Sequence, residues 1–132
     1  MATEKFVYLS YPEAVALHIE LMRYLGETRY GVFDRALVES ALARPEQAAT
    51  YENADLIAQA ATPLYGLVKN HPWVGGNKRT ATFLADRFLN RHGLFISAPK
   101  SEFVALVLAV EADRWQTTEI DAWLRRYTRT LS

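Results

Sequence analysis

The chain is 132 residues long, and its 50% hydrophobic and 12% aromatic content is enough for the core of a single domain over residues 1–132. Its 15 basic and 15 acidic side chains cancel, which gives no reason to expect direct binding to nucleic acid or to an anionic membrane. The lack of cysteine excludes disulfides and thiolate metal sites, and the lack of a leader or of an apolar run near roughly 20 residues favours a cytoplasmic protein.

The first 26 residues are predicted to form a short strand and a helix. An apolar run at residues 6–9 predicts the strand. Ser10, with Glu13 three residues later, has the arrangement of a capping box, and the apolar period that follows predicts a helix ending at Gly26. His18 falls within or beside the apolar face of this helix, with no acid or second ligand spaced to work with it. We therefore interpret His18 as a packed histidine rather than a functional one.

The segment that follows is predicted to form a loop and a short second helix. The loop surrounds Gly31, and Asp34 is placed to cap the helix. Pro45 is expected to end this helix. Residues 46–51 show no clear hydrophobic period and are expected to form a loop.

Two long helices are expected to form the antiparallel core pair. The first begins near Asn53 or the adjacent acids and ends near Asn70, with a kink expected at Pro63. The second covers residues 77–92 and ends at Gly93. We expect the chemistry of the protein at the junction between these two helices.

The C-terminal third is predicted to add a strand and two helices. Residues 94–97 are expected to pair with the strand at 6–9. One helix starts at Ser101 or the preceding lysine, and Thr117 or Thr118 caps the last helix. Three cations near the end of that helix are interpreted as structural, because cations are favourable there: Arg125, Arg126 and Arg129. The expected fold class is mainly all-α, a helical bundle with at most a short two-stranded hairpin.

The segment between the two core helices carries polar chemistry in a tight turn. A proline ends the first helix, and Gly75 and Gly76 let the backbone bend. The next helix starts at this turn, where unpaired N–H groups and the helix dipole favour an anion. Lys78 and Arg79 oppose that dipole, which suggests a bound anion, and His71 places a general base beside it. An ordinary turn followed by solvated cations is the alternative that the pattern leaves open.

The nine residues His-Pro-Trp-Val-Gly-Gly-Asn-Lys-Arg at 71–79 resemble the signature of the Fic/Doc superfamily. That signature runs His-Pro-Phe, any residue, Asp or Glu, Gly-Asn, and then Gly-Arg or Lys-Arg. Lys78 in place of a third glycine is similar to the Doc branch, the death-on-curing toxins. Residues 65–70, and residues 42–45 with Tyr51, also look like that branch. The resemblance covers nearly the whole chain and implies a Fic/Doc-like helical bundle.

Two positions depart from the signature. Trp73 stands where the family usually has phenylalanine, a change that is tolerated if the ring packs beneath the turn. Gly75 stands where the family has the acidic residue that holds the Mg²⁺ bridging the nucleotide phosphates. Glycine offers no side-chain ligand to this metal, so we expect impaired catalysis.

The resemblance implies that His71 is the general base that deprotonates a hydroxyl of a target protein. Four consecutive residues would hold the phosphates of ATP: Gly76, Asn77, Lys78 and Arg79. The lysine variant goes with Doc toxins, which transfer the γ-phosphate of ATP to elongation factor Tu and so arrest translation. Fic enzymes with a third glycine usually transfer AMP instead. The second arginine of their signature is Thr82 here, which is again similar to the Doc branch, so AMP transfer is the alternative.

Partners and regulation follow from the same resemblance. A Doc toxin is neutralised by a separate antitoxin whose tail folds into a groove near the active site. No segment here matches the self-inhibition pattern of Fic proteins, so we expect a Phd-like antitoxin. Residues 46–51 correspond to the flap that orients the target, with Arg44 and Tyr51 as candidate residues. An ordinary surface loop is the alternative.

Gly75 leaves two further alternatives open. One is a degenerate Fic-fold module that binds a nucleotide or a partner without catalysis. The other is an active toxin in which a single-base change of an Asp codon was selected during cloning.

Overall fold

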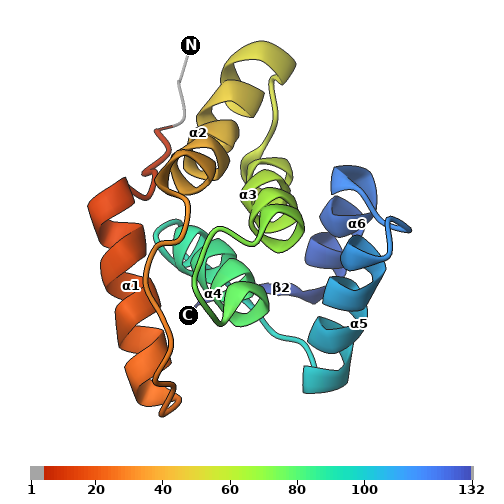
Figure 1. Ribbon diagram of the computed structural model, residues 1–132. Helices are drawn as coiled ribbons and strands as arrows, with labels where there is room; N and C mark the ends of the chain where they lie inside the picture. The colour runs from red at the N-terminus through yellow and green to blue at the C-terminus, as the bar shows by residue number, and fades with distance from the viewer. Residues whose placement is uncertain (1–4, 132) are drawn as a thin grey trace.

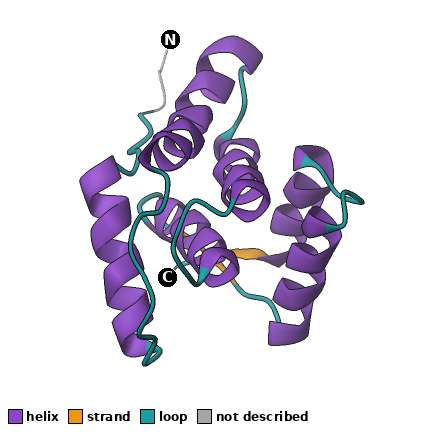
Figure 2. Ribbon diagram, viewed as in Figure 1, coloured by secondary structure: helices purple, strands orange, loops and turns teal. Residues whose placement is uncertain are grey.

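The computed structural model describes residues 5–131, which form six helices and one two-stranded antiparallel sheet (Figures 1 and 2). The helices are α1 (Tyr11–Tyr24), α2 (Arg35–Glu52), α3 (Leu56–Asn70), α4 (Asn77–Asn90), α5 (Lys100–Glu111) and α6 (Thr117–Tyr127). The strands are β1 (Leu94–Ile96) and β2 (Thr128–Thr130), in a register that pairs Phe95 with Arg129. The prediction of a mainly all-α fold is confirmed. Within the described range, no helix is both long enough and apolar enough to cross a membrane.

Local signals in the sequence determine where the first helices begin. Ser10 accepts a hydrogen bond from the N–H of Glu13, whose carboxylate accepts one from the N–H of Ser10, which closes the predicted capping box. Asp34 caps α2 as predicted by accepting a hydrogen bond from the first turn. The N-cap of α6 is Gln116 rather than the predicted Thr117 or Thr118, and its N–H donates to the carboxylate of Glu119.

The predicted strand at residues 6–9 is wrong. β1 pairs with β2 instead, because α6 returns the end of the chain to the side of β1. Val7 donates its backbone N–H to Nε2 of His92, and the ring of Tyr8 stacks on that of Phe88 with 5.8 Å between centroids. Side-chain contacts with the end of α4 therefore hold this segment, rather than a ladder of backbone hydrogen bonds.

The prediction that Pro45 ends the second helix is also wrong, and residues 46–51 are helical rather than a loop. Helix α2 runs through Pro45 and ends at Glu52, and its C-cap Asn53 is in the left-handed conformation with φ of 52°. A proline inside a helix costs about 3 kcal/mol, chiefly through a lost hydrogen bond and a steric clash. Pro45 and Ala48 are both buried, and burial of this face of α2 offsets that cost.

Helix α3 is at the centre of the fold and contacts α2, α4, α5 and α6 (Figure 1). Its apolar face is almost completely buried and includes Ala60, Ala61, Leu64, Leu67 and Val68. Helix α4 packs on α3, as predicted for the core pair, and the turn at residues 71–76 joins them. The chain therefore places the conspicuous turn where its two central helices meet.

Candidate functional site

Two residues in the left-handed conformation shape the turn between α3 and α4. His71, the C-cap of α3, has φ of 47°, and Gly76, the N-cap of α4, has φ of 66°. The proline that follows His71 disfavours helical geometry at His71, so α3 ends there. Histidine tolerates the left-handed region better than most residues, whereas a side chain at position 76 would also collide with Met22.

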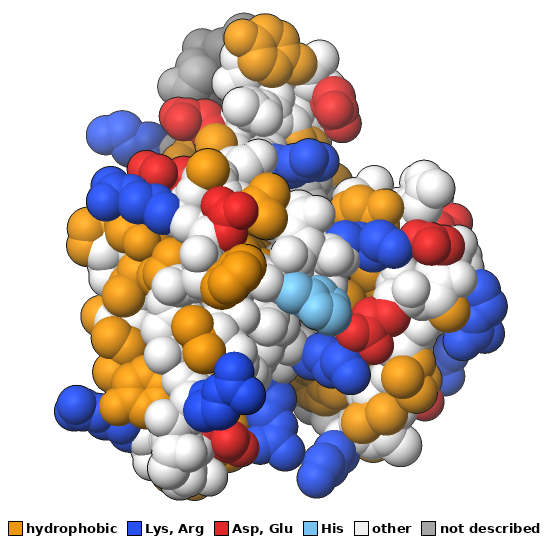
Figure 3. All heavy atoms as spheres, viewed as in Figure 1, with side chains coloured by type: hydrophobic (Ala, Val, Ile, Leu, Met, Phe, Trp, Pro, Cys, Tyr) orange, Lys and Arg blue, Asp and Glu red, His pale blue; other side chains and the backbone are white. Residues whose placement is uncertain are grey.

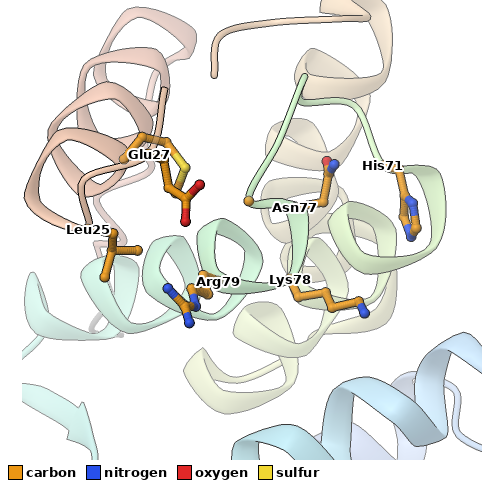
Figure 4. Close-up of a pocket in the computed structure, with 8 residues that line it drawn as sticks. Leu25, Glu27, His71, Asn77, Lys78 and Arg79 are labelled. Atoms are coloured by element: carbon orange, nitrogen blue, oxygen red, sulfur yellow. The ribbon is translucent and has the colours of Figure 1, made fainter. Parts of the chain in front are cut away.

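A pocket of about 310 Å³ opens at this turn and brings together the residues that the motif predicted (Figure 4). It is lined by His71, Gly76, Asn77, Lys78 and Arg79, together with Met22, Leu25 and Glu27. His71 and Lys78 lie at one side of the pocket, and Glu27 lies at the other. The last three lining residues come from the end of α1 and the loop after it, and the sequence pattern did not indicate them.

The start of α4 is suited to an anion. The first N–H groups of any helix have no partner inside it, and here, within the described residues, no side chain caps them either. No acid lies in that turn, and Lys78 and Arg79 place two positive charges against the helix dipole. Free N–H groups and cations at a helix start are the elements of a phosphate site.

The side chain of Asn77 is bonded to the turn itself. Its Oδ1 accepts a hydrogen bond from the N–H of Trp73 at 2.8 Å, and its Nδ2 donates to the carbonyl of Trp73 at 3.0 Å. Both polar ends of the amide are therefore engaged. This leaves Asn77 with its backbone N–H as the group available to a ligand.

A buried histidine ties three segments together behind the turn. His18 of α1 accepts a hydrogen bond from the N–H of Gly31 at Nε2, over 3.0 Å, and its Nδ1 lies 2.8 Å from Oγ1 of Thr80. Its ring stacks on Trp73 with 4.2 Å between centroids, and both side chains are buried. The interpretation of His18 as a packed histidine is confirmed, and Trp73 does pack beneath the turn.

This environment predicts a pH-dependent stability. Burial lowers the pKa of His18 from its ordinary value of 6.5 to about 4, so between these values the unfolded chain binds a proton that the folded chain does not. Above pH 6.5, His18 is neutral in both states and its effect on the free energy of unfolding does not change. As the pH falls from 6.5 to 4, the free energy of unfolding should decrease by about 3 kcal/mol, because the unfolded state binds the proton first. Urea unfolding across this range measures the effect. In the His18→Gln variant, the free energy of unfolding should no longer decrease by this amount between pH 6.5 and 4. The same decrease in the variant would contradict the attribution of the effect to His18.

The chain is similar to a known protein family over more than half of its length. It matches the family model described as Fic/DOC family over residues 8–89, a span that contains α1 to α3, all of α4 except its last residue, and all residues lining the pocket at the turn. The chain belongs to the Fic/DOC family. A comparison with curated protein sequences found no match.

The loop at residues 27–33 packs against the Fic/DOC motif, a contact that the sequence did not indicate. Val74 donates its N–H to the carbonyl of Gly31 at 2.9 Å, and Val32 and Trp73 form an isolated antiparallel bridge. The loop therefore lies along the motif in the manner of a paired strand.

Gly75 lies where this loop comes closest to the motif. A Cβ at position 75 would stand 2.7 Å from the carbonyl oxygen of Arg29, so an aspartate there requires the loop backbone to move. Among the described residues that line the pocket, Glu27 is the only acid. Across residues 5–131, no group of three or more His, Cys, Asp or Glu side chains is arranged to hold a metal ion. The residues present do not fit the Mg²⁺ site that Fic/DOC motifs usually carry.

Arg44 and Tyr51 lie on α2 and not on a loop, and neither lines the pocket at the turn. Both side chains are exposed, Tyr51 to 83%. The prediction of a flap-like loop at residues 46–51 is therefore wrong, because these residues form part of the second half of α2. The segment that runs beside the Fic/DOC motif is residues 27–33 instead.

Proposed function

We propose that the protein is a Doc-type toxin of a toxin–antitoxin system that transfers the γ-phosphate of ATP to a hydroxyl of a translation factor such as elongation factor Tu. The observation that carries this proposal is the pocket that joins His71, Lys78 and Arg79 at the uncapped start of α4. Membership of the Fic/DOC family supports a nucleotide-dependent transfer. Lys78 in place of a third glycine favours the Doc branch over AMP transfer, and we propose a cytoplasmic location because translation factors act there.

In the proposed reaction, His71 accepts the proton of the target hydroxyl while the hydroxyl oxygen attacks the γ-phosphorus and ADP leaves. The side chain of His71 is 51% exposed, which leaves it accessible to a protein substrate. The first N–H groups of α4, together with Lys78 and Arg79, offset the negative charge of the phosphates. Because the residues around Gly75 do not fit Mg²⁺, we expect transfer by this chain to be slow.

Replacing Arg79 with alanine is expected to weaken ATP binding about tenfold to a hundredfold, because a hydrogen bond between charged groups contributes about 1.5–3 kcal/mol. Isothermal titration calorimetry measures this change. Arg87→Ala is the matched control, since Arg87 is also on α4 but stacks on Phe83 at 5.0 Å and lies outside the pocket at the turn. Equal affinities for the two variants would argue against a phosphate site at the turn.

A second candidate function is a module that binds a nucleotide or a partner without catalysis. The approach of the Arg29 carbonyl to Gly75 favours this alternative, because the loop occupies the space in which an acidic side chain would stand. In that case the pocket would keep its phosphate-binding groups and lack the metal that accelerates transfer.

A Phd-like antitoxin is the proposed partner. A groove of about 590 Å³ next to the site has an apolar lining from α5 and a basic edge. Its lining includes Phe103, Val104, Val107 and Leu108, with Lys78, Arg79 and Lys100 at the basic edge. Val104 and Leu108 are about half exposed although they are apolar. A segment with an apolar face and acidic side chains would cover this groove and reach Lys78 and Arg79.

Transfer of label from ATP tests the function. The protein and its Gly75→Asp variant are each incubated with elongation factor Tu, Mg²⁺ and ATP labelled at the γ- or the α-phosphate. Label from the γ position, stronger with the variant, is the expected result. Label from the α position would indicate AMP transfer. No label with either folded protein, together with measurable ATP binding, would favour the non-catalytic module.

A further inference from the structure

Glu111, the last residue of α5, faces both His71 and Lys78. Its Oε2 lies 3.4 Å from Nε2 of His71, and its Oε1 lies 3.4 Å from Nζ of Lys78. The Glu111 side chain is 25% exposed, against 51% for His71 and 54% for Lys78. On the face shown in Figure 3, a histidine side chain lies against acidic and basic side chains. One carboxylate thus joins the group proposed to accept the proton and a group proposed to bind phosphate.

The position of Glu111 is unfavourable for an acid in isolation. A carboxylate at the C-terminus of a helix opposes the helix dipole, so its contacts with His71 and Lys78 offset a local cost. A separate ion pair joins Asp113, just beyond α5, to Lys69 of α3; the Asp113 side chain is 76% exposed, and such a pair contributes little to stability. Glu111 also lies outside the span that matches the family model, which ends at residue 89.

We propose that Glu111 is a positioning residue, which holds His71 and Lys78 in the free protein and releases Lys78 when a nucleotide phosphate binds. The proposal rests on the proposed function of the pocket. Lys78 cannot pair fully with Glu111 and with a phosphate at once, so the carboxylate competes with the incoming anion. At His71, the same carboxylate orients the ring and stabilises the positive charge that the imidazole gains when it accepts a proton.

In the Glu111→Gln variant, the expected change in phosphate affinity and the expected change in transfer rate have opposite signs. The amide keeps the size of the side chain but not its charge. We expect affinity for inorganic tripolyphosphate to rise about two- to fivefold, the range of a partly exposed ion pair. We expect the rate of γ-phosphate transfer to fall by about tenfold or more, because the imidazolium loses its counter-charge. A merely structural role would lower affinity, rate and thermal stability together, and that result would overturn the proposal.

Asp113→Asn is the matched control, since it makes the same change of charge two residues away but pairs with Lys69 rather than with the pocket. Calorimetry should show that Glu111→Gln binds tripolyphosphate more tightly than the unmodified protein does. Asp113→Asn should bind it with the same affinity as the unmodified protein. Equal tightening in both variants would reflect net charge alone and would overturn the proposal.

Nuclear magnetic resonance of the ligand-free protein separates this proposal from the proposed function. The imidazole signals of His71 and the ammonium signal of Lys78 should move in Glu111→Gln and stay in place in Asp113→Asn. If neither moves in Glu111→Gln, Glu111 does not hold these groups and the inference fails, whether or not a nucleotide binds. If both move but tripolyphosphate and ATP bind to none of the proteins, the proposed function fails, and the release of Lys78 fails with it.

Discussion

Replacing Gly75 with alanine is expected to lower the free energy of unfolding by about 1–3 kcal/mol, and replacing it with aspartate by at least as much. The cause is the 2.7 Å that would separate a new Cβ from the carbonyl oxygen of Arg29. A backbone atom cannot rotate away as a flexible side chain can, so the loop at residues 27–33 has to shift. Urea unfolding measures the loss of stability. The amide signals of Gly31 and Val74 report the shift, because the Val74 N–H bonds to the Gly31 carbonyl.

Val74→Asp is the control for this experiment. It adds the same charge one residue earlier, on a side chain that is already 39% exposed, and leaves the contact at Gly75 open. Gly75→Ala adds the Cβ without the carboxylate, so the pair separates the steric effect from the electrostatic one. If both Gly75 variants are as stable as the parent and their Gly31 and Val74 signals are unchanged, the loop does not confine position 75. An aspartate at position 75, as in the family signature, would then be accommodated without cost.

Replacing His71 with alanine is expected to lower the rate of γ-phosphate transfer about 10²–10⁴-fold, the usual contribution of a positioned general base. Affinity for ATP should stay within about twofold, because in the proposed reaction His71 contacts the hydroxyl and not the phosphates. The label-transfer assay measures the rate, in whichever of the parent and Gly75→Asp proteins gives the stronger signal. Calorimetry measures the affinity.

His92→Ala controls for the loss of a histidine. His92 lies just beyond α4, accepts a hydrogen bond from the N–H of Val7 and does not line the pocket at the turn. Its removal should cost some stability and leave the transfer rate of the folded protein unchanged. An unchanged rate in His71→Ala would exclude His71 as the base. A loss of ATP binding in that variant would show that His71 supports the shape of the turn instead.

Several features of this protein were determined by residues close together in the sequence. The capping box of Ser10 and Glu13 predicted the start of α1, because its hydrogen bonds span a single helical turn. The grouping of His71, Lys78 and Arg79 in one pocket was predicted for the same reason. A proline-ended helix followed by a glycine turn brings neighbours in sequence together whatever the rest of the fold does. The span that matches the Fic/DOC family model, residues 8–89, includes this segment, so the sequence alone indicated the family.

Other features were decided by contacts between distant parts of the chain. The burial of Pro45 on the core let α2 continue where the local signal predicted its end, and α6 gave β1 a partner other than residues 6–9. The approach of Arg29 to Gly75 and the placement of Glu111 beside His71 depend on loops and helix ends that only packing brings to the motif. No periodicity encodes such contacts, because their energy comes from surfaces that meet only once the helices have assembled around α3.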